Sequence, residues 1–350
     1  AARRGLSVAV FERRRAPVDK ACGEGLMPAG VAALDRLGVL PLIAREDTSS
    51  FDGIVYVQED GSRAVGRLPA PGGLGVRRVA LAAAMTERAR QAGALLHESC
   101  SVRAWRADQA GVTVTTDAGE VRAQVLVAAD GLHSPLRRAA GLERPHRGPR
   151  RFGLRRHVAT AAWSSNVEVH FARGAEAYVT PAGRARVGVA FLWEDGALET
   201  PVSFTSLLAR FPVIEAQIRG ATWDSSPRGA GPLLQSVTRR AGDRFVLAGD
   251  AAGYVDAITG EGLSLAFEGA AALGEALPAA LGRRATRASF APYERAMRGL
   301  FDRYARLARL LVWTAARPAL RRFVIDRLVA HPSLFDAVLA RVSAPSPGKF

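Results

Sequence analysis

The sequence predicts an α/β protein, because it places an acid and several glycines where a buried strand gives way to a helix. This pattern is concentrated in Arg244–Ala270, RFVLAGDAAGYVDAITGEGLSLAFEGA. The apolar run Phe245–Ala248 is too short for a helix and is bounded by Gly249, so it predicts a buried strand. Asp250 then lies at the carboxyl end of that strand, the edge at which open α/β sheets bind ligands.

A glycine-spaced loop follows and leads into a helix. The loop is Thr259-Gly260-Glu261-Gly262, and the apolar helix is predicted over Leu263–Leu277. Such a start directs unpaired backbone N–H groups and the positive end of the helix at any group in front, which suits an anionic or electron-rich ligand. An ordinary tight turn would also use glycines, but the strand, the acid and the glycine-led helix together favour ligand binding.

Length and composition indicate a globular protein. A chain of 350 residues with 48% hydrophobic residues can form one large α/β domain or two that share an interface. No apolar run reaches membrane-spanning length and no signal peptide is visible, so we expect a cytoplasmic protein. Cys22 and Cys100 lack CxxC spacing and the six His residues lack HxxxH spacing, so we expect neither a disulfide framework nor a metal site.

The net charge of +15 comes almost entirely from arginine, since Lys20 and Lys349 are the only lysines. The arginines are scattered along the chain rather than gathered in a stripe interleaved with aromatic residues. We therefore expect no nucleic-acid partner. The positive field would favour acidic ligands and anionic surfaces.

The first residues fall inside a predicted unit of structure. Ala1–Gly5 predicts the last turn of a helix, and Leu6–Phe11 predicts a buried strand. A dinucleotide site needs an earlier strand and a GxGxxG turn, so roughly 20 residues are expected to be missing upstream. Glu12 ends the strand and precedes Arg13. We interpret this acid as an acceptor for ribose hydroxyls, with a surface ion pair as the alternative.

A second acid follows a strand farther along. The strand predicted over Val121–Val127, continuing to Ala129, delivers Asp130-Gly131 to its end, just before a short helix at Ser134–Ala140. Glycine after the acid permits close approach by a ligand, whereas an Asp that caps the helix is the alternative. Other predicted elements in this half are helices at Pro28–Leu37 and Arg78–Ala92 and strands at Phe51–Val57, Ala64–Leu68, Leu95–Glu98, Val102–Ala107 and Val112–Thr116.

A second group of strands interrupts this portion, and helices end the chain. We expect the strands to form a sheet that walls a substrate pocket. The helices are expected to pack their apolar stripes on the back of the domain, with membrane-surface association as the alternative. The strands are Arg150–Val158, Val167–Phe171, Ala177–Thr180 and Arg186–Trp193, and the helices are Phe290–Ala316, Pro318–Leu328 and Leu334–Val342.

Three segments resemble motifs of the flavoprotein hydroxylase and geranylgeranyl reductase superfamily. Arg244–Ala270 resembles its second FAD-binding motif, Val125–Arg138 (VLVAADGLHSPLRR) its Asp-Gly motif, and Val8–Glu12 (VAVFE) the strand whose terminal Glu holds the adenosine ribose. The resemblance covers nearly the whole chain. It implies a Rossmann-like FAD-binding domain of the three-layer ββα/βαβ type, interrupted by a mixed β-sheet substrate domain and followed by C-terminal helices. The implied FAD-binding parts are 1–50, 77–145 and 241–285, the substrate parts 51–76 and 146–240, and the helical part 286–350.

The resemblance also implies which residues bind the cofactor. RVAL, beginning at Arg78, matches an Arg-x-x-Leu whose arginine lies near the FAD pyrophosphate. Asp130 and Gly131 would contact FAD, and the backbone N–H groups of Glu261–Leu263 would stabilise charge at the N1/O2 edge of the flavin. The full set of expected FAD-binding residues is Glu12, Arg13, Arg78, Asp130, Gly131, Gly249, Asp250, Gly260, Glu261, Gly262 and Leu263.

Departures from the family patterns leave two activities open. Cys22-Gly23 resembles the geranylgeranyl reductase branch, where hydroxylases often carry an Arg. Cys22 is therefore either a candidate catalytic residue or a small buried apolar one. Tyr178–Gly183 (YVTPAG) stands where those reductases have a Trp and a Phe-Pro-Lys, which favours a hydroxylase. Ala257 stands where many hydroxylases have Pro, and the Trp-x-Trp-x-Ile-Pro signature of tryptophan halogenases is absent.

The resemblance therefore implies an NAD(P)H-driven, FAD-dependent monooxygenase, monomeric or homodimeric, acting on an apolar aromatic or polyketide-like small molecule. NAD(P)H would reduce FAD, and O₂ would then supply the oxygen atom added to the substrate. The alternatives are a geranylgeranyl-reductase-like FAD ene-reductase and a truncated flavoprotein without activity. His157, His170 and Tyr178 are candidates for the pocket, although such residues more often serve the structure.

Overall fold

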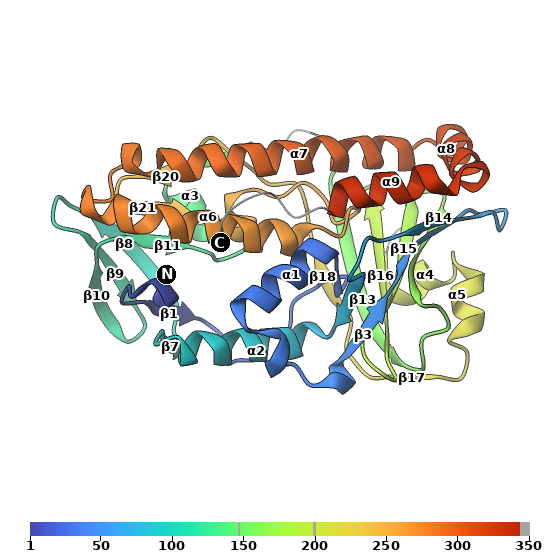
Figure 1. Ribbon diagram of the computed structural model, residues 1–350, viewed down its shortest axis with the longest axis horizontal. Coiled ribbons are helices and arrows are strands. Elements are labelled where there is room, and N and C mark those ends of the chain that lie inside the picture. The colour runs from blue at the N-terminus through green and yellow to red at the C-terminus, as the bar shows by residue number, and fades with distance from the viewer. Residues whose placement is uncertain (146–147, 199–200, 344–350) are drawn as a thin grey trace.

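The computed structural model describes residues 1–145, 148–198 and 201–343. Figure 1 shows an elongated molecule with small sheets at one end and a large sheet at the other. The long helices α6 (Gly262–Gly282) and α7 (Ala291–Ala315) pack side by side along one edge. None of the described helices combines the length and the apolar character needed to cross a membrane.

Two parallel strand pairs lie at the end with the small sheets. β1 (Ala9–Glu12) pairs with β7 (Leu95–Glu98), and β11 (Leu126–Ala128) pairs with β21 (Phe245–Leu247), which β20 (Ala241–Gly242) flanks. Because β11 and β21 run parallel, their carboxyl ends meet at the same edge of the sheet. The chain that follows each strand therefore starts from the same edge.

The structure corrects two expectations for these strands. Instead of one strand over Val121–Val127, β10 (Gly119–Ala123) pairs antiparallel with β9, and β11 then joins β21 in another sheet. The segment conceals this change of partner because Val121–Val127 contains neither Gly nor Pro to mark a break. The expectation of a buried first strand is also wrong, since Val10 is 40% exposed. β1 pairs with β7 alone among the described strands, which leaves it open on its other side.

The large sheet has eight strands, mixed in direction. Every neighbouring pair is antiparallel except β4 and β14, which run parallel. Its order is β17 (Thr222–Trp223), β13 (Arg151–Ala159), β16 (Val187–Glu194), β15 (Ala175–Pro181), β14 (Asn166–Ala172), β4 (Gly53–Val57) and β5 (Arg63–Arg67), with β18 (Arg228–Ala230) also on β13.

Helices cover both faces of the large sheet because its strands alternate their side chains between two cores. Val189 and Phe191 of β16 pack against α4 (Phe204–Leu208) and α5 (Pro212–Gln217), two short helices that the sequence patterns did not predict. Val169 and Phe171 of β14 pack on the other side, against α8 (Pro318–Ala330) and α9 (Pro332–Ser343).

Smaller sheets and helices join the two ends of the molecule. Gly75 lies where a Cβ atom would come within 1.6 Å of the Pro181 carbonyl oxygen, so only glycine permits β6 to approach β15 this closely. The smaller sheets are β2 (Gly25–Leu26), β6 (Gly73–Val76) and β3 (Thr48–Phe51); β12 (Glu143–Arg144) and β19 (Ser236–Val237); and β8 (Val102–Ala107), β9 (Val112–Thr116) and β10. The remaining helices are α1 (Pro28–Leu37), α2 (Arg78–Gln91), α3 (Pro135–Ala139) and the 3₁₀ helices at Ala2–Arg4, Leu40–Leu42, Arg45–Asp47, Gly249–Ala252 and Arg287–Phe290.

Candidate cofactor site

The two parallel strands β11 and β21 end in the two acid-containing turns. β21 is followed by Gly249, whose φ of 60° is left-handed, and then by Asp250. β11 is followed by Asp130 and by Gly131, whose φ is 83°. A Cβ atom on Gly131 would lie 3.7 Å from the Lys20 ammonium nitrogen. The sequence patterns did not single out Lys20, which contributes a positive charge at this edge.

Asp250 carries a partly buried carboxylate, which accepts no hydrogen bond from any described residue. Burial raises the pKa of this carboxyl group, while the positive charges of Lys20 and Arg78 act in the opposite direction. A carboxylate can accept several hydrogen bonds, and burying one without them is costly. This unsatisfied acceptor is suited to the hydroxyl groups of a bound ligand.

Asp130 is already engaged within the chain. Its Oδ2 accepts a hydrogen bond from the Leu136 N–H at 3.1 Å, and the Ser134 hydroxyl donates to its Oδ1. Ser134 in turn caps α3 by accepting from the Arg137 N–H. The carboxylate thus performs the capping role that the sequence offered as the alternative, and its contact with FAD stays a prediction.

The glycine loop presents donors at the start of α6. Gly260 has a φ of 68°, with no atom near the position that a Cβ would take. The N–H groups of Gly262, Leu263 and Ser264 donate to no acceptor among the described residues. These free donors lie at the positive end of the 21-residue helix α6, an arrangement that suits an anionic or electron-rich ligand group. Binding of such a group at this loop stays a prediction.

Glu261, in the same loop, has an unusual acidity. Burial raises the pKa of its carboxyl group to about 7, and the nearby Glu268 adds to this while Arg303 opposes it. Glu261 is therefore partly protonated near neutral pH. Its charge would respond to the arrival of an anionic or electron-rich ligand at the N-terminus of α6.

Glu12 ends β1, as predicted, but belongs to a different sheet from the two acids above. One of its carboxylate oxygens accepts a hydrogen bond from the Arg14 N–H at 3.0 Å, within its own turn. Arg13 is exposed. No hydrogen bond or ion pair of the described residues joins Glu12 to Asp130 or Asp250. Their joint action on one ligand remains a prediction.

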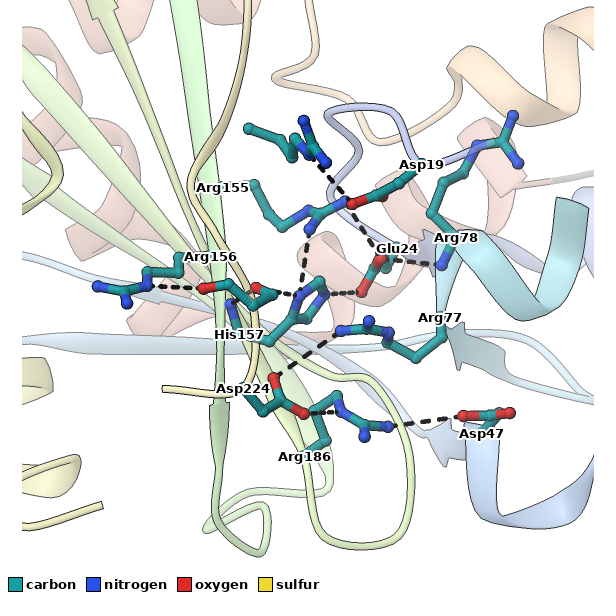
Figure 2. Close-up of polar contacts among 12 residues, drawn as sticks. Asp19, Glu24, Asp47, Arg77, Arg78, Arg155, Arg156, His157, Arg186 and Asp224 are labelled. Carbon is teal, nitrogen blue, oxygen red and sulfur yellow. Dashed lines mark hydrogen bonds and ion pairs between the residues drawn. The ribbon is translucent and has the colours of Figure 1, made fainter. Parts of the chain in front are cut away.

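A buried polar network connects the Lys20–Gly25 loop to the large sheet (Figure 2). Glu24, only 2% exposed and with a left-handed φ of 62°, is at its centre. Glu24 Oε1 accepts from the Arg78 N–H at 2.8 Å, at the start of α2, and its Oε2 meets His157 Nε2. Arg155 Nη2 donates to Asp19 Oδ1 at 2.6 Å. The network positions the loop and α2 against β13.

The partners of His157 determine its protonation. Its Nδ1 lies 3.2 Å from Arg155 Nη1 and 2.9 Å from the Ser225 hydroxyl oxygen. An arginine can only donate, so Nδ1 must accept and Nε2 must carry the hydrogen that points to Glu24. Burial lowers the pKa of His157, and the charges of Arg155 and Arg77 lower it further, although Glu24 opposes them. The imidazole is therefore neutral and locked in one tautomer.

Cys22 lies two residues before Glu24, and its Sγ accepts a hydrogen bond from the Glu24 N–H at 3.3 Å. Burial and then the negative charge of Glu24 raise the pKa of the thiol. A protonated thiol is a poor nucleophile but can donate a proton. Sequence patterns did not reveal Glu24 or the aromatic residue Tyr254, whose ring lies 3.2 Å from the position of a Gly262 Cβ atom.

Tyr254 brings a hydroxyl group beside the start of α6. Its backbone N–H donates to the Gln235 carbonyl oxygen and its carbonyl oxygen accepts from the Gln235 N–H. Its side-chain hydroxyl makes no hydrogen bond with a described residue. Burial raises its pKa well above the ordinary value, so the phenol stays protonated. The only signal in the sequence was its place between the strand-end acid and the glycine loop. No group of three or more His, Cys, Asp or Glu among the described residues is arranged to hold a metal ion.

Two parallel strand ends with acids, a glycine-led helix start and a partly buried carboxylate without a hydrogen-bond donor are the features of a dinucleotide-binding α/β protein. The residues fit a dinucleotide such as FAD, because Asp250 offers an acceptor to hydroxyl groups and the N-terminus of α6 offers donors. The chain belongs to the FAD binding domain family, which it matches over residues 2–306. The protein is accordingly an FAD-dependent oxidoreductase.

Comparison with curated proteins gives relatives of two kinds. The chain is 29% identical to menaquinone reductase of Mycobacterium tuberculosis over 294 residues, which are 77% of this chain and 70% of the relative. It is 30% identical to digeranylgeranylglycerophospholipid reductase 1 of Methanopyrus kandleri over 313 residues, 83% of this chain and 79% of that one. Kynurenine 3-monooxygenase of Salinispora arenicola is 26% identical over 339 residues, with 83% and 71% covered.

Among solved structures, a flavoprotein/dehydrogenase from Cytophaga hutchinsonii superposes with a TM-score of 0.83. The superposition covers 97% of this chain and 87% of that one at 18% identity. This likeness shows the fold: an FAD-binding α/β architecture with mixed sheets and C-terminal helices, as the sequence predicted.

Proposed function

We propose that the protein reduces a carbon–carbon double bond in an apolar, isoprenoid-like molecule, with NAD(P)H as the source of electrons. The observation that carries this proposal is an apolar cavity of about 40 Å³ between the large sheet and the C-terminal helices. Ile258, one of its walls, lies two residues before Gly260 of the cofactor loop. The other lining residues are Tyr56, Val169, Phe171, Tyr178, Leu311, Thr314, Ala315, Arg321, Val324 and Ile325.

The relatives support the same choice. Two proteins aligned with most of this chain are named reductases, one of menaquinone and one of a digeranylgeranyl lipid. Both names refer to molecules with long apolar chains. The apolar cavity can admit part of such a chain, and a longer segment requires α7 and α8 to separate. The hydroxylation that the sequence patterns favoured becomes the second candidate.

FAD held at this site, once reduced by NAD(P)H, would be the hydride source for one carbon of the double bond and would be left oxidised, and the other carbon would need a proton. Two side chains stay protonated beside the cofactor loop: the Cys22 thiol and the Tyr254 hydroxyl. Either could donate that proton and recover one from water. Asp250 would accept hydrogen bonds from FAD hydroxyl groups, and the Gly262 and Leu263 N–H groups would hold negative charge on the reduced flavin.

The second candidate is a monooxygenase acting on an aromatic molecule. It is favoured by the similarity to the S. arenicola kynurenine 3-monooxygenase and by Tyr178–Gly183, which replaces the Trp and Phe-Pro-Lys of the reductase branch. The two candidates use the same cofactor and the same NAD(P)H. They differ in whether O₂ enters the product.

The proposal also covers the division of the chain and its state in the cell. We assign the substrate wall to the large sheet, in which β4 from residues 51–76 pairs with β14 from residues 146–240 and with β5. β6, also within 51–76, pairs instead with β2 and β3 in a separate sheet. The cytoplasmic location and a monomeric or homodimeric state complete the proposal.

Single-turnover reactions of the FAD-loaded protein would test it. The protein would be reduced with NAD(P)H and mixed with a menaquinone or a geranylgeranyl lipid, under nitrogen and under air. Reduction of the double bond predicts, under nitrogen, a product with two hydrogens added to the isoprenoid chain, which remain after any quinol has been reoxidised in air. Hydroxylation predicts one added oxygen atom, and only under air. The same reactions would be run with aromatic substrates. If neither a reduced nor a hydroxylated product formed from any substrate, both candidate functions would be overturned.

A further inference from the structure

Six large apolar side chains are exposed on the last three helices. Those on α7 are on its outward side: Leu310 and Trp313 are opposite Ala308 and Ala315, which face the core. We call the six together the C-terminal surface: Leu310, Trp313, Phe323, Val329, Leu334 and Val338, between 42% and 57% exposed. α7, α8 and α9 follow one another at the upper right of Figure 1.

The protein core does not need these side chains. On α8 and α9 the inward-facing residues Ile325, Phe335 and Leu339 already fill the space against the large sheet. A Cβ atom on Gly66 would lie only 2.6 Å from the Phe335 ring, which shows how closely α9 approaches β5. One side of these helices is therefore firmly packed against the sheet, while the other side exposes apolar side chains to water. Exposed apolar groups of this kind are typical of interaction sites.

Arginines surround the exposed apolar groups. Residues 303–343 contain eight arginines but only two acids, Asp326 and Asp336. Asp336 is engaged by the Arg67 N–H at 2.7 Å. Five exposed arginines of this segment form no ion pair with a carboxylate of the described residues: Arg306, Arg309, Arg317, Arg327 and Arg341.

Some of these arginines lie directly on the aromatic rings. The Arg317 guanidinium is 4.3 Å from the centre of the Trp313 ring, and that of Arg327 is 5.1 Å from the Phe323 ring. Arginine above an aromatic ring keeps its charge available to a third, anionic group. Aromatic rings and arginines in this combination favour the interface between a bilayer and water, where rings insert and guanidinium groups reach phosphates.

We propose that the C-terminal surface docks the protein on an anionic lipid bilayer. The apolar groups would enter the interface, and the five arginines would meet lipid phosphates. Charge complementarity selects this occupant, because a purely apolar partner would leave the arginines without counter-charges. Association would be peripheral and reversible, since the described helices lack a membrane span.

The apolar cavity lies next to the C-terminal surface, so docking would bring the cavity close to the bilayer. Leu311 and Thr314 of α7 and Val324 of α8 line the cavity, and each is adjacent in sequence to an exposed residue of the C-terminal surface. A lipid substrate could pass from the bilayer between α7 and α8 without crossing water. This last point rests on the proposed reduction, whereas the docking itself does not.

Vesicle co-sedimentation of the FAD-loaded protein tests the docking. Vesicles of phosphatidylcholine alone would be compared with vesicles that also contain phosphatidylglycerol. We expect at least tenfold stronger binding to the anionic vesicles, and loss of most of that difference in about 1 M salt, where the Debye length falls to about 3 Å. Binding that ignores both lipid charge and salt would overturn the role of the arginines.

Matched variants separate the C-terminal surface from the general charge of the chain. Trp313→Ser with Phe323→Ser should weaken binding at least tenfold. The control pair Leu95→Ser with Val213→Ser, 64% and 56% exposed on other elements, should leave it unchanged. For charge, Arg309→Gln with Arg317→Gln would be compared with Arg138→Gln with Arg219→Gln, all four exposed.

Flavin content and the thermal transition show whether each variant is folded. Equal vesicle binding by test and control variants would overturn the assignment of the docking surface, as would absence of binding by the unmodified protein. Turnover of a detergent-solubilised substrate without vesicle binding would refute the docking but keep the reduction. Vesicle binding without turnover of any isoprenoid would refute the reduction alone.

Discussion

Replacing Glu24 by glutamine should destabilise the protein far more than the exchange of one oxygen for an amide nitrogen suggests. Glu24 is 2% exposed and accepts from two donors, the Arg78 N–H at 2.8 Å and His157 Nε2. A glutamine amide has one acceptor and one donor group. In either orientation its NH₂ group therefore faces one of those donors.

The imidazole cannot relieve this conflict by changing its tautomer. A hydrogen moved to Nδ1 of His157 could be donated to the Ser225 hydroxyl oxygen at 2.9 Å, but Arg155 Nη1, 3.2 Å away, would then lose Nδ1 as its acceptor. One buried donor must remain without an acceptor, which costs about 1–3 kcal/mol, and a hydrogen bond to a charged acceptor worth about 1.5–3 kcal/mol is lost. Together these costs amount to roughly 3–5 kcal/mol, the middle of their combined range.

The expected change can be expressed as a melting temperature. An unfolding entropy of about 2.1 cal/mol/K per residue gives about 0.7 kcal/mol/K for a chain of 350 residues. Glu24→Gln should then lower the melting temperature by about 4–7 °C.

Scanning calorimetry of the FAD-loaded protein would measure this shift, with Glu120→Gln as the control. Glu120 also binds an arginine, Arg106 at 2.7 Å, but the pair is exposed, so its loss should leave the transition unchanged within error. If Glu24→Gln and Glu120→Gln melt at the same temperature, the assignment of donors and acceptors around His157 is wrong.

Three further predictions concern the cofactor, the pH and the cavity. Asp250→Ala should lose most of its flavin on gel filtration while Cys22→Ala keeps it, and equal flavin absorbance would contradict the role of Asp250. The pKa of Glu261 is about 7 in the folded protein, above its usual value, so the stability that this bound proton contributes is lost as pH rises from about 5 to 8. The unmodified protein should therefore lose melting temperature over this range relative to Glu261→Gln, which has no proton to release. A difference in melting temperature that stays constant with pH would refute the raised pKa. Ala315→Leu, which fills the apolar cavity, should raise the KM for an isoprenoid substrate at unchanged flavin content, whereas the exposed control Ala316→Leu should not.

Much of the fold was predictable because its elements are bounded by local signals. Helix α1 and strands β7, β8 and β9 have the bounds that periodicity and turn residues gave. The errors arose where partners changed. Val121–Val127 has no Gly or Pro to interrupt it but belongs to two sheets, and only the pairing of β10 with β9 and of β11 with β21 reveals the break.

The candidate site divides in the same way. Asp250 and the glycine loop could be located from the sequence, because a strand end and a helix start are local features. Glu24 could not, because its partner His157 lies 133 residues away on another sheet. No sequence periodicity links Glu24 to His157. The left-handed φ of Glu24 could not be predicted either, because glutamate rarely adopts this conformation.

Arginine accounts for nearly all of the positive charge, yet its physical role depends on where it lies. Arg137 is buried and donates to Glu143, to the Leu132 carbonyl oxygen and to the Gln235 side chain. A planar guanidinium can serve all these acceptors at once, so lysine could not replace it. Exposed arginines without carboxylates, in contrast, stay hydrated in the folded protein and remain available to an external anion. Composition does not distinguish buried from exposed arginines. It therefore indicated an affinity for anionic surfaces but not which surface of the protein would bind them.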